Sequence, residues 1–301
     1  MSSLNKITLF IWLWICIQPI VGIRTDETPL FDPFLSAKSI SLGKSANLTH
    51  KIATNMMQNP ATIVDKKSIA MTAVQYFDIE YSSIFFTNQL YDTSIGFSYI
   101  GSSITDIERS SVENMIVKPV TSSIPYEYHA LSIALAKSFG QLTLGVGGQL
   151  QALILDDTLQ QKISQFFGFT FDISDELIIG GALQNLNSEH DKSNALQKGY
   201  PIQTIGASFK MSKRTNANIS FIHNKNEIST HSTLHYGVEH YMNDYVPIRV
   251  GLDHNRYTFG TGLNFDPFEI DIGWAQSRHS VAEDQVTVTF TYGFIESNHL
   301  Y

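Results

Sequence analysis

The sequence of 301 residues is poor in cysteine, in charge and in long apolar segments. Its single cysteine, Cys16, cannot form an internal disulfide, so the fold does not depend on a disulfide framework. Charged residues make up only 16% of the chain, against about 25% in an average soluble domain. The 28 acidic residues outnumber the 20 basic ones and no basic cluster occurs, which argues against a nucleic-acid partner, because phosphates are bound by clustered Lys and Arg.

Aromatic residues, in contrast, are abundant. The chain contains 19 Phe and 13 Tyr, yet its mean hydropathy is only −0.05. This composition excludes an intrinsically disordered chain, which would carry few aromatics and a high charge. How the apolar residues are distributed along the chain therefore decides the class of protein.

Residues 1–22 have the pattern of a signal peptide. Lys6 precedes an apolar run over residues 7–17, and Gly22 offers a small residue at a plausible cleavage point. Such a run extends about 16 Å as a helix, well short of the roughly 30 Å of a bilayer core, so it fits a retained membrane anchor poorly. No later stretch contains 18 consecutive apolar residues. We therefore expect an exported chain that loses Cys16 with its signal peptide and can cross a membrane only with β-strands.

From about Ser68 onward, apolar and polar residues alternate with a period of two, which is typical of strands with two different faces. Near the C-terminus, for example, Val286, Val288 and Phe290 fall on one face, while Thr residues and a Gly fall on the other. The alternating segments are about ten residues long, which fits a tilted membrane strand better than the five or six residues usual in soluble proteins.

We count about fourteen such segments. They are expected near residues 67–77, 80–89, 91–101, 126–139, 141–155, 163–174, 176–187, 201–211, 215–225, 232–242, 246–256, 257–265, 267–277 and 284–294. Most linkers are short and polar, so consecutive strands should pair antiparallel. Longer loops are expected at 102–125 and 188–200, and lesser ones at 156–162 and 278–283. The sequence thus predicts an all-β fold, an antiparallel transmembrane β-barrel of about 14 strands over residues 67–294, with a tail at 295–301.

A soluble β-sandwich is the alternative, because its strands also alternate. A sandwich buries its apolar face and usually carries charge on the outer one. Here the non-apolar face is mostly Thr, Gly, Gln and Asn, with few Lys or Glu, and aromatic residues gather near the strand ends. Together with the strand length, these features favour the membrane barrel.

Residues 23–66 precede the barrel and have a different pattern. Within them, residues 47–58 show helix-like spacing, with Leu48, Ile52 and Met56 on one side, and Pro60 is expected to end the helix. A helical segment attached to the start of a barrel lies either in the periplasm or inside the lumen. We therefore expect a short N-terminal helical plug.

No motif indicates catalysis, a metal or a cofactor. Gly43-Lys44-Ser45 lacks the earlier glycine of a phosphate-binding loop, whose place is taken by Lys38. His231 and His235 are four residues apart, but on a strand this spacing separates them by about 13 Å, too far for one metal ion. No G-x-S-x-G nucleophile motif occurs. We expect no enzymatic activity and no cofactor.

Charged residues within the predicted strands are the best candidates for a lumen site. If the apolar face meets lipid, the alternation places six such residues on the inner face: His235, Glu239, Arg249, Asp253, Glu269 and Asp271. Arg249 could then pair with Glu239, Asp253 or Asp271. The group is expected to be a salt-bridge network that holds the barrel's shape, and a polar anchor for a substrate head group is the alternative.

Several short motifs follow one another in a recognisable order. They are Phe34-Leu35-Ser36-Ala37-Lys38, Leu42-Gly43, Asn59-Pro60-Ala61, Leu183-Gln184-Asn185-Leu186, Tyr236-Gly237-Val238-Glu239-His240-Tyr241, Ile248-Arg249-Val250-Gly251-Leu252, Gly260-Thr261-Gly262-Leu263 and Ile270-Asp271. With its motifs in this order, the sequence resembles the FadL/PorV superfamily of outer-membrane proteins from about Phe34 to Phe294.

The resemblance implies a barrel of the bacterial outer membrane whose lumen is plugged by the N-terminal segment. In the FadL branch, such barrels pass long-chain fatty acids or other hydrophobic compounds by passive diffusion, and the ligand leaves through a kink in the wall. In the PorV/PorQ branch, the barrel binds protein cargo of type IX secretion. We expect the transporter, and the secretion accessory barrel and a purely structural barrel remain as alternatives.

The resemblance also implies partners and a plug motif. The expected partners are outer-membrane lipids, a hydrophobic small-molecule ligand, the barrel-assembly machinery during insertion and, in the alternative, secretion-system proteins. Within the plug, Asn59, Pro60 and Ala61 match the family's turn into the first strand. Met56 and Met57 beside them are adaptable apolar side chains that can line a ligand pocket, although packing of the plug against the wall is the favoured explanation.

Overall fold

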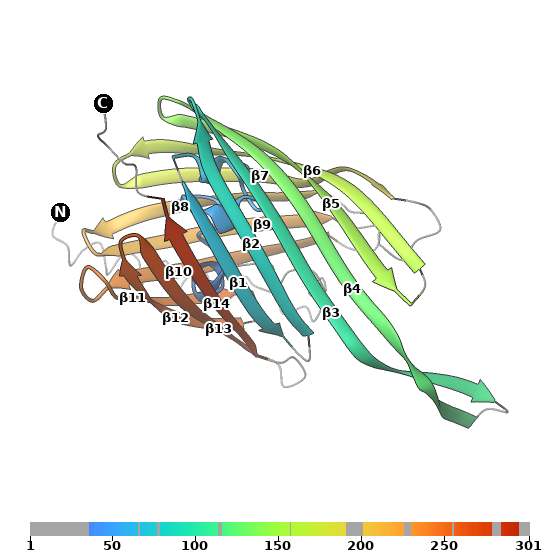
Figure 1. The fold of residues 1–301 in the computed structure, drawn as a ribbon. Helices are drawn as coiled ribbons and strands as arrows, with labels where there is room; N and C mark the ends of the chain where they lie inside the picture. Colours follow the sequence, from blue (N-terminus) through green and yellow to red (C-terminus); the bar gives the residue numbers. More distant parts are fainter. Residues whose placement is uncertain are drawn as a thin grey trace. The chain divides into compact units, whose positions relative to one another are not determined.

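Fourteen antiparallel strands close into a barrel within the part of the chain that the structure describes (Figure 1). In this computed structural model, the described residues are 36–65, 67–76, 79–113, 116–156, 158–190, 201–225, 230–254, 256–278 and 284–294. They belong to the unit that runs from Pro33 to Tyr301. Each strand is hydrogen-bonded to the next along the chain, and β1 closes the ring by pairing with β14. The closed order confirms the predicted fold class.

The alternating segments of the sequence become the strands of this ring. Their bounds are β1 (Ser68–Tyr76), β2 (Ile79–Leu90), β3 (Thr93–Glu113), β4 (Ile116–Phe139), β5 (Leu142–Leu155), β6 (Thr158–Ser174), β7 (Leu177–His190), β8 (Ile202–Ser212), β9 (Thr215–Lys225), β10 (Thr230–Tyr241), β11 (Pro247–Asp253), β12 (Arg256–Phe265), β13 (Phe268–Ser277) and β14 (Gln285–Gly293). No helix among the described residues is long and apolar enough to span a bilayer.

The two faces of the wall are inverted relative to a water-soluble protein. On β14, Val286 and Val288 are 45% and 41% exposed on the outside, whereas Thr287 and Thr289 are 0% and 3% exposed on the inside. The same holds on β13, where Ile270 and Ile272 point outward and Asp271 is buried. A sandwich would bury the apolar set instead. An exposed apolar face over a buried polar one fits a barrel whose outside meets lipid.

One end of the barrel, which we call the turn end, carries short connections such as Tyr91–Asp92 and Gly140–Gln141. It is ringed by aromatic contacts. The rings of Phe268 and Tyr292 lie 5.1 Å apart, and Tyr292 and Phe294 lie 5.5 Å apart. Aromatic girdles of this kind mark a membrane–water interface, and short turns are usual on the periplasmic side.

The opposite end, the loop end, differs from the prediction. The sequence predicts a loop at 102–125, but β3 and β4 continue through it as a two-stranded ribbon in which Ile107 to Glu113 pair with Ile116 to Ile124 (Figure 1). The pairing of β3 with β2 ends at Ser103, so the ribbon extends past the barrel wall. The sequence of this ribbon lacks the alternation by which strands are predicted, because a ribbon beyond the barrel wall needs no apolar outer face. The predicted loop at 156–162 is also wrong, since β6 already begins at Thr158.

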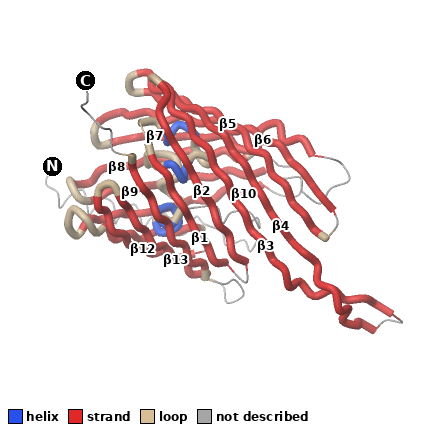
Figure 2. Tube along the Cα trace, viewed as in Figure 1, coloured by secondary structure: helices blue, strands red, loops and turns tan. Residues whose placement is uncertain are grey.

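The plug lies inside the ring of strands, where Figure 2 shows its short helices. It consists of α2 (Ala37–Ser41), η2 (Ala53–Asn55) and η3 (Pro60–Ile63), joined by turns. The helix predicted over residues 47–58 is therefore wrong, because Ile52 is extended and Pro60 begins a helical turn rather than ending one. Leu48 packs towards β7 and β8 whereas Met56 packs towards β3, so the residues with helix-like spacing contact two different parts of the wall.

Some predicted features lie outside the described residues. They are the signal peptide at 1–22, the first part of the plug segment at 23–35, most of the loops at 188–200 and 278–283, and the tail at 295–301.

Reversing the polarity of one outward side chain tests the lipid-facing surface. Val288 lies in the middle of β14, so Val288→Arg should destabilise the barrel in a lipid bilayer by about 2–4 kcal/mol. Urea unfolding in liposomes measures this loss. A variant as stable as the wild type would indicate that Val288 faces water and would contradict the membrane barrel.

Candidate functional site in the plugged lumen

Arg249 forms the centre of a buried ion cluster on the inner wall. Its Nε donates to Glu239 Oε2 at 2.6 Å, its Nη1 donates to Asp271 Oδ1 at 2.5 Å, and its Nη2 lies 3.9 Å from Glu269 Oε1. The plug residue Lys38 completes this Arg249 cluster, with its ammonium 3.5 Å from Glu239. Arg249 itself is fully buried. The cluster joins three strands of the wall to the plug.

The strand pairing brings these residues together. Glu239 on β10 lies directly opposite Arg249 on β11. Asp271 is on β13, separated from β11 by β12, and its pairing partner on β12 is Gly262. A Cβ at Gly262 would overlap the Asp271 carboxylate, so the glycine leaves room for the Arg249 and Asp271 side chains to meet across β12.

Asp253 is the centre of a second buried cluster, nearer the loop end. Arg256 donates to its Oδ2 at 2.6 Å, and the plug ammonium of Lys44 lies 3.1 Å from the same oxygen. The Nδ1 atom of His235 lies 3.2 Å from Asp253 Oδ1 and 2.9 Å from the carbonyl oxygen of Gly43 in the plug. This Asp253 cluster therefore also links wall and plug.

The six predicted lumen residues are thus divided between two clusters that bind the plug. Burial by itself would lower the pKa of the Lys38 ammonium, but the carboxylates of Glu239 and Glu269 outweigh it and raise that pKa above its ordinary value. Glu239, Arg249 and Asp271 are 2%, 0% and 3% exposed, and each already has an ionic partner. These contacts support a structural role for the group rather than a ligand anchor.

Inward-facing glycines allow the plug backbone to touch the wall. A Cβ at Gly251 would overlap the backbone of Leu42 and Gly43, and Gly43 itself has φ +61°, which favours glycine. The same close approach to the plug backbone recurs at Gly145, Gly180, Gly237 and Gly273, and at Gly260 a Cβ would meet the Ser41 side chain. The sequence places these glycines on the polar face but gives no sign of the plug segment each one meets.

The plug motif is anchored in the same way. The Nδ2 atom of Asn59 donates to the carbonyl oxygens of Leu48 at 2.7 Å and Phe169 at 3.0 Å, while its Oδ1 accepts from the Ala61 amide. Gly168 on β6 leaves space for the Asn59 side chain, and Pro60 and Ala61 lie against Gly145 on β5. The Asn59-Pro60-Ala61 turn is therefore a point of attachment between plug and wall.

The methionines lie on the apolar side of the lumen. Met56 and Met57 pack in one cluster with side chains of the opposing wall, among them Phe85, Tyr128 and Phe166. This Met57 cluster consists of apolar and aromatic side chains. The lumen is therefore asymmetric, with charged contacts over β10–β13 and apolar side-chain contacts over β2–β6.

The wall beside Met57 is irregular. Register shifts interrupt the pairing of β6 and β7 around Gln165 and Leu186, and Asn185 has φ +55°, which Asn tolerates better than most residues. The neighbouring Gln184 points inward and donates to the Met57 carbonyl oxygen at 2.8 Å. The motif Leu183-Gln184-Asn185-Leu186 thus places a bulge in the wall next to the plug.

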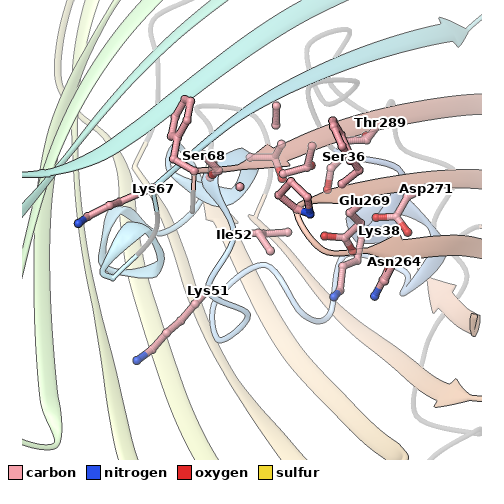
Figure 3. Close-up of a pocket in the computed structure, with 18 of the residues that line it drawn as sticks. Ser36, Lys38, Lys51, Ile52, Lys67, Ser68, Asn264, Glu269, Asp271 and Thr289 are labelled. Carbon is pink, nitrogen blue, oxygen red and sulfur yellow. The ribbon is translucent and has the colours of Figure 1, made fainter. Parts of the chain in front are cut away.

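Two hollows adjoin the plug and this wall. A cavity of about 600 Å³ lies at the turn end, and Figure 3 shows Glu269, Asp271 and Lys38 on one side of it with Lys51 and Lys67 on the other. Its lining is mixed, with apolar residues such as Ile52 and Phe268 beside the charged ones. A second hollow of about 500 Å³ is a groove over β6–β9, lined by Phe167, Leu183, Ile205 and Phe221 among others. These side chains point outward, so the groove opens on the apolar exterior.

Solved structures share this architecture. The toluene transporter TodX of P. putida has a TM-score of 0.65 at 13% identity, covering 87% of this chain and 99% of its own. The toluene transporter TbuX of Ralstonia pickettii has a TM-score of 0.60 at 12% identity (88% and 100% covered), and a Pseudomonas aeruginosa FadL homologue has 0.53 at 10% (87% and 99%). No family model and no curated protein matches the sequence.

The chain has the FadL-type barrel fold. The match extends over almost the full length of each of these barrels, and the ring of this chain has the fourteen strands that its sequence predicts. At such low identities the likeness establishes the FadL-type fold and not the solute. The resemblance read from the short motifs is thus confirmed at the level of the fold.

Removing the central cation tests the structural role of the Arg249 cluster in this FadL-type barrel. Arg249→Met leaves Glu239 and Asp271 buried without their main partner, so the barrel should lose about 3–5 kcal/mol of stability. Urea unfolding in detergent measures the change. The triple variant Arg249→Met/Glu239→Gln/Asp271→Asn is the control and should recover much of the loss. Normal stability of Arg249→Met with lost uptake would instead support a ligand anchor.

The close approach of plug and wall makes a second prediction. A side chain at Gly251 would meet the plug backbone, which cannot rotate away, so Gly251→Val should lower the stability by about 1–3 kcal/mol or more. Gly148 is the matched control, because a Cβ there would lie 3.8 Å from its nearest neighbour, the Ser164 carbonyl oxygen. Equal unfolding midpoints for Gly251→Val and Gly148→Val would contradict this account.

Proposed function

We propose that this protein is an outer-membrane channel for the passive passage of hydrophobic small molecules. The observation that carries the proposal is the apolar Met57 cluster at the point where the plug meets the inner wall of a FadL-type barrel. A nonpolar solute gains free energy by leaving water for such a surface. The apolar exterior supports a location in the outer membrane.

The names of the similar structures agree with this class of solute. TodX and TbuX are described as toluene transporters and CymD as a monoaromatic hydrocarbon channel. We extend the proposal to long-chain fatty acids, which combine a long apolar body with one polar end. Passive passage needs no catalytic residue, so the proposal is non-enzymatic, and its expected partners are membrane lipids and the solute.

Uptake by intact cells tests the proposal. Deleting the protein should reduce the uptake of toluene and of oleate supplied at low concentration, while the uptake of a small polar sugar should stay the same. Reintroducing the wild-type chain should restore the loss. Unchanged uptake of both hydrophobic probes would remove the proposal, and loss of surface-attached proteins instead would favour the secretion accessory barrel.

A pair of methionine variants locates the path. Met57→Trp overfills the apolar cluster where the solute is proposed to pass. A barrier to passage raised by about 1–3 kcal/mol, the usual cost of overpacking, should lower hydrophobic uptake by about tenfold. Met71→Trp is the matched control, because Met71 is 51% exposed on the outer face of β1. Faster migration of unheated samples on gels shows that both variants fold. Equal uptake by the two variants would place the path elsewhere.

A further inference from the structure

The ribbon of β3 and β4 has two edges beyond the barrel wall, and no described residue outside the ribbon pairs with either of them. The pairing of β2 with β3 ends at Ser103, and the pairing of β5 with β4 ends at Tyr126 (Figure 1). Beyond these points the two strands pair only with each other, as far as Glu113 and Ile116. Two strands by themselves form a marginal sheet, and an exposed edge is a template for a further strand.

The edge of β4 carries the features by which proteins block such pairing. Pro119 and Pro125 lack the N–H group that a neighbouring strand would need, and Lys118 adds a charge. The register with β3 also shifts on this strand, where Thr121 and Ser122 are skipped in the pairing. We therefore do not expect another strand to pair with β4.

The edge of β3 carries none of these features. From Ile107 to Glu113 it is a continuous strand without proline, lysine or an inserted residue. Because a proline within a sheet turns its nitrogen towards a free edge, Pro119 and its partner Ser110 are not hydrogen-bonded to each other. The alternation of an antiparallel ladder then turns the backbone N–H and C=O groups of Ser110 and Val112 towards the free edge of β3.

A second copy of β3 is complementary to this edge. In an antiparallel pair of identical strands, the free backbone groups of Ser110 and Val112 have to meet those of the other copy. Among the registers that this allows, one places Arg109, the only basic residue of the segment, opposite Glu113, and symmetry repeats the pair. Shifting the strands by one step brings Arg109 opposite Ser111, and a further step brings it opposite Arg109 of the other copy.

We propose that two copies of this protein associate through their ribbons, with the free edges of β3 paired antiparallel from Arg109 to Glu113. In this register Ser111 of one copy lies opposite Ser111 of the other. The contact is short, so the association should be reversible. The proposal does not depend on the proposed function, because it involves no solute.

Single cysteines test the register. Opposite Cα atoms lie about 4.5 Å apart where the pair is not hydrogen-bonded, within the roughly 4.4–6.8 Å that a disulfide spans. Ser111→Cys in the full-length protein, folded in detergent and oxidised with copper phenanthroline, should therefore form a disulfide-linked dimer. Ser110→Cys is the matched control and should stay monomeric, because its counterpart is a diagonal neighbour at roughly 7–8 Å. The wild type, whose single cysteine is Cys16, gives the background.

Charge reversal in the Ser111→Cys background provides a second readout. Arg109→Glu places like charges opposite each other and should remove most of the cross-linked dimer, and adding Glu113→Arg should restore it. Faster migration of unheated samples on gels shows that the barrel of each variant folds.

Three results would overturn the proposal. One is equal cross-linking of Ser110→Cys and Ser111→Cys, or none above the background, and another is a dimer that Arg109→Glu leaves unchanged. The third is a disulfide to a protein of another mass in place of the dimer, which would assign the edge of β3 to a different partner.

Discussion

The contact between the plug backbone and the inner wall is the constraint on which the lumen depends. Glycines such as Gly251 and Gly273 lie where the chain of the plug passes, and a Cβ at either position would overlap it. This close approach brings Lys38 and Lys44 within reach of Glu239 and Asp253. The ion pairs therefore depend on the steric fit between plug and wall, because a plug held farther away could not form them.

The ion pairs divide the lumen into two unlike halves. Over β10–β13 the plug is held by buried charges, and separating them would leave uncompensated ions inside the barrel. Over β2–β6 it is held by Met56, Met57 and other apolar side chains, whose contacts are not directional. The apolar half can rearrange around a solute at lower cost. The bulge at Asn185 lies beside the wall of this same half.

The apolar outer surface of the barrel is set by the same strands that face the plug. Because residues alternate along each strand, every glycine or acid that faces the plug leaves its neighbours facing outward, as Ile270 and Ile272 do beside Asp271. The low overall charge of the chain has this origin. One face is apolar and points outward, and the other meets a plug whose lysines Lys38 and Lys44 are paired with the wall.

The sequence by itself determined the closed barrel, the orientation of its strands and the inward set around Arg249, because an alternation of period two assigns each side chain to a face. Only the tertiary structure decided what those side chains meet. The spacing of Leu48, Ile52 and Met56 suggested a helix, yet Leu48 and Met56 contact different parts of the wall, and the ribbon of β3 and β4 has no alternation to reveal it. The inward glycines show the same limit. The position of Gly251 on the inner face follows from parity, but which plug segment it meets depends on the tertiary structure, because residues distant in sequence leave no periodic signal.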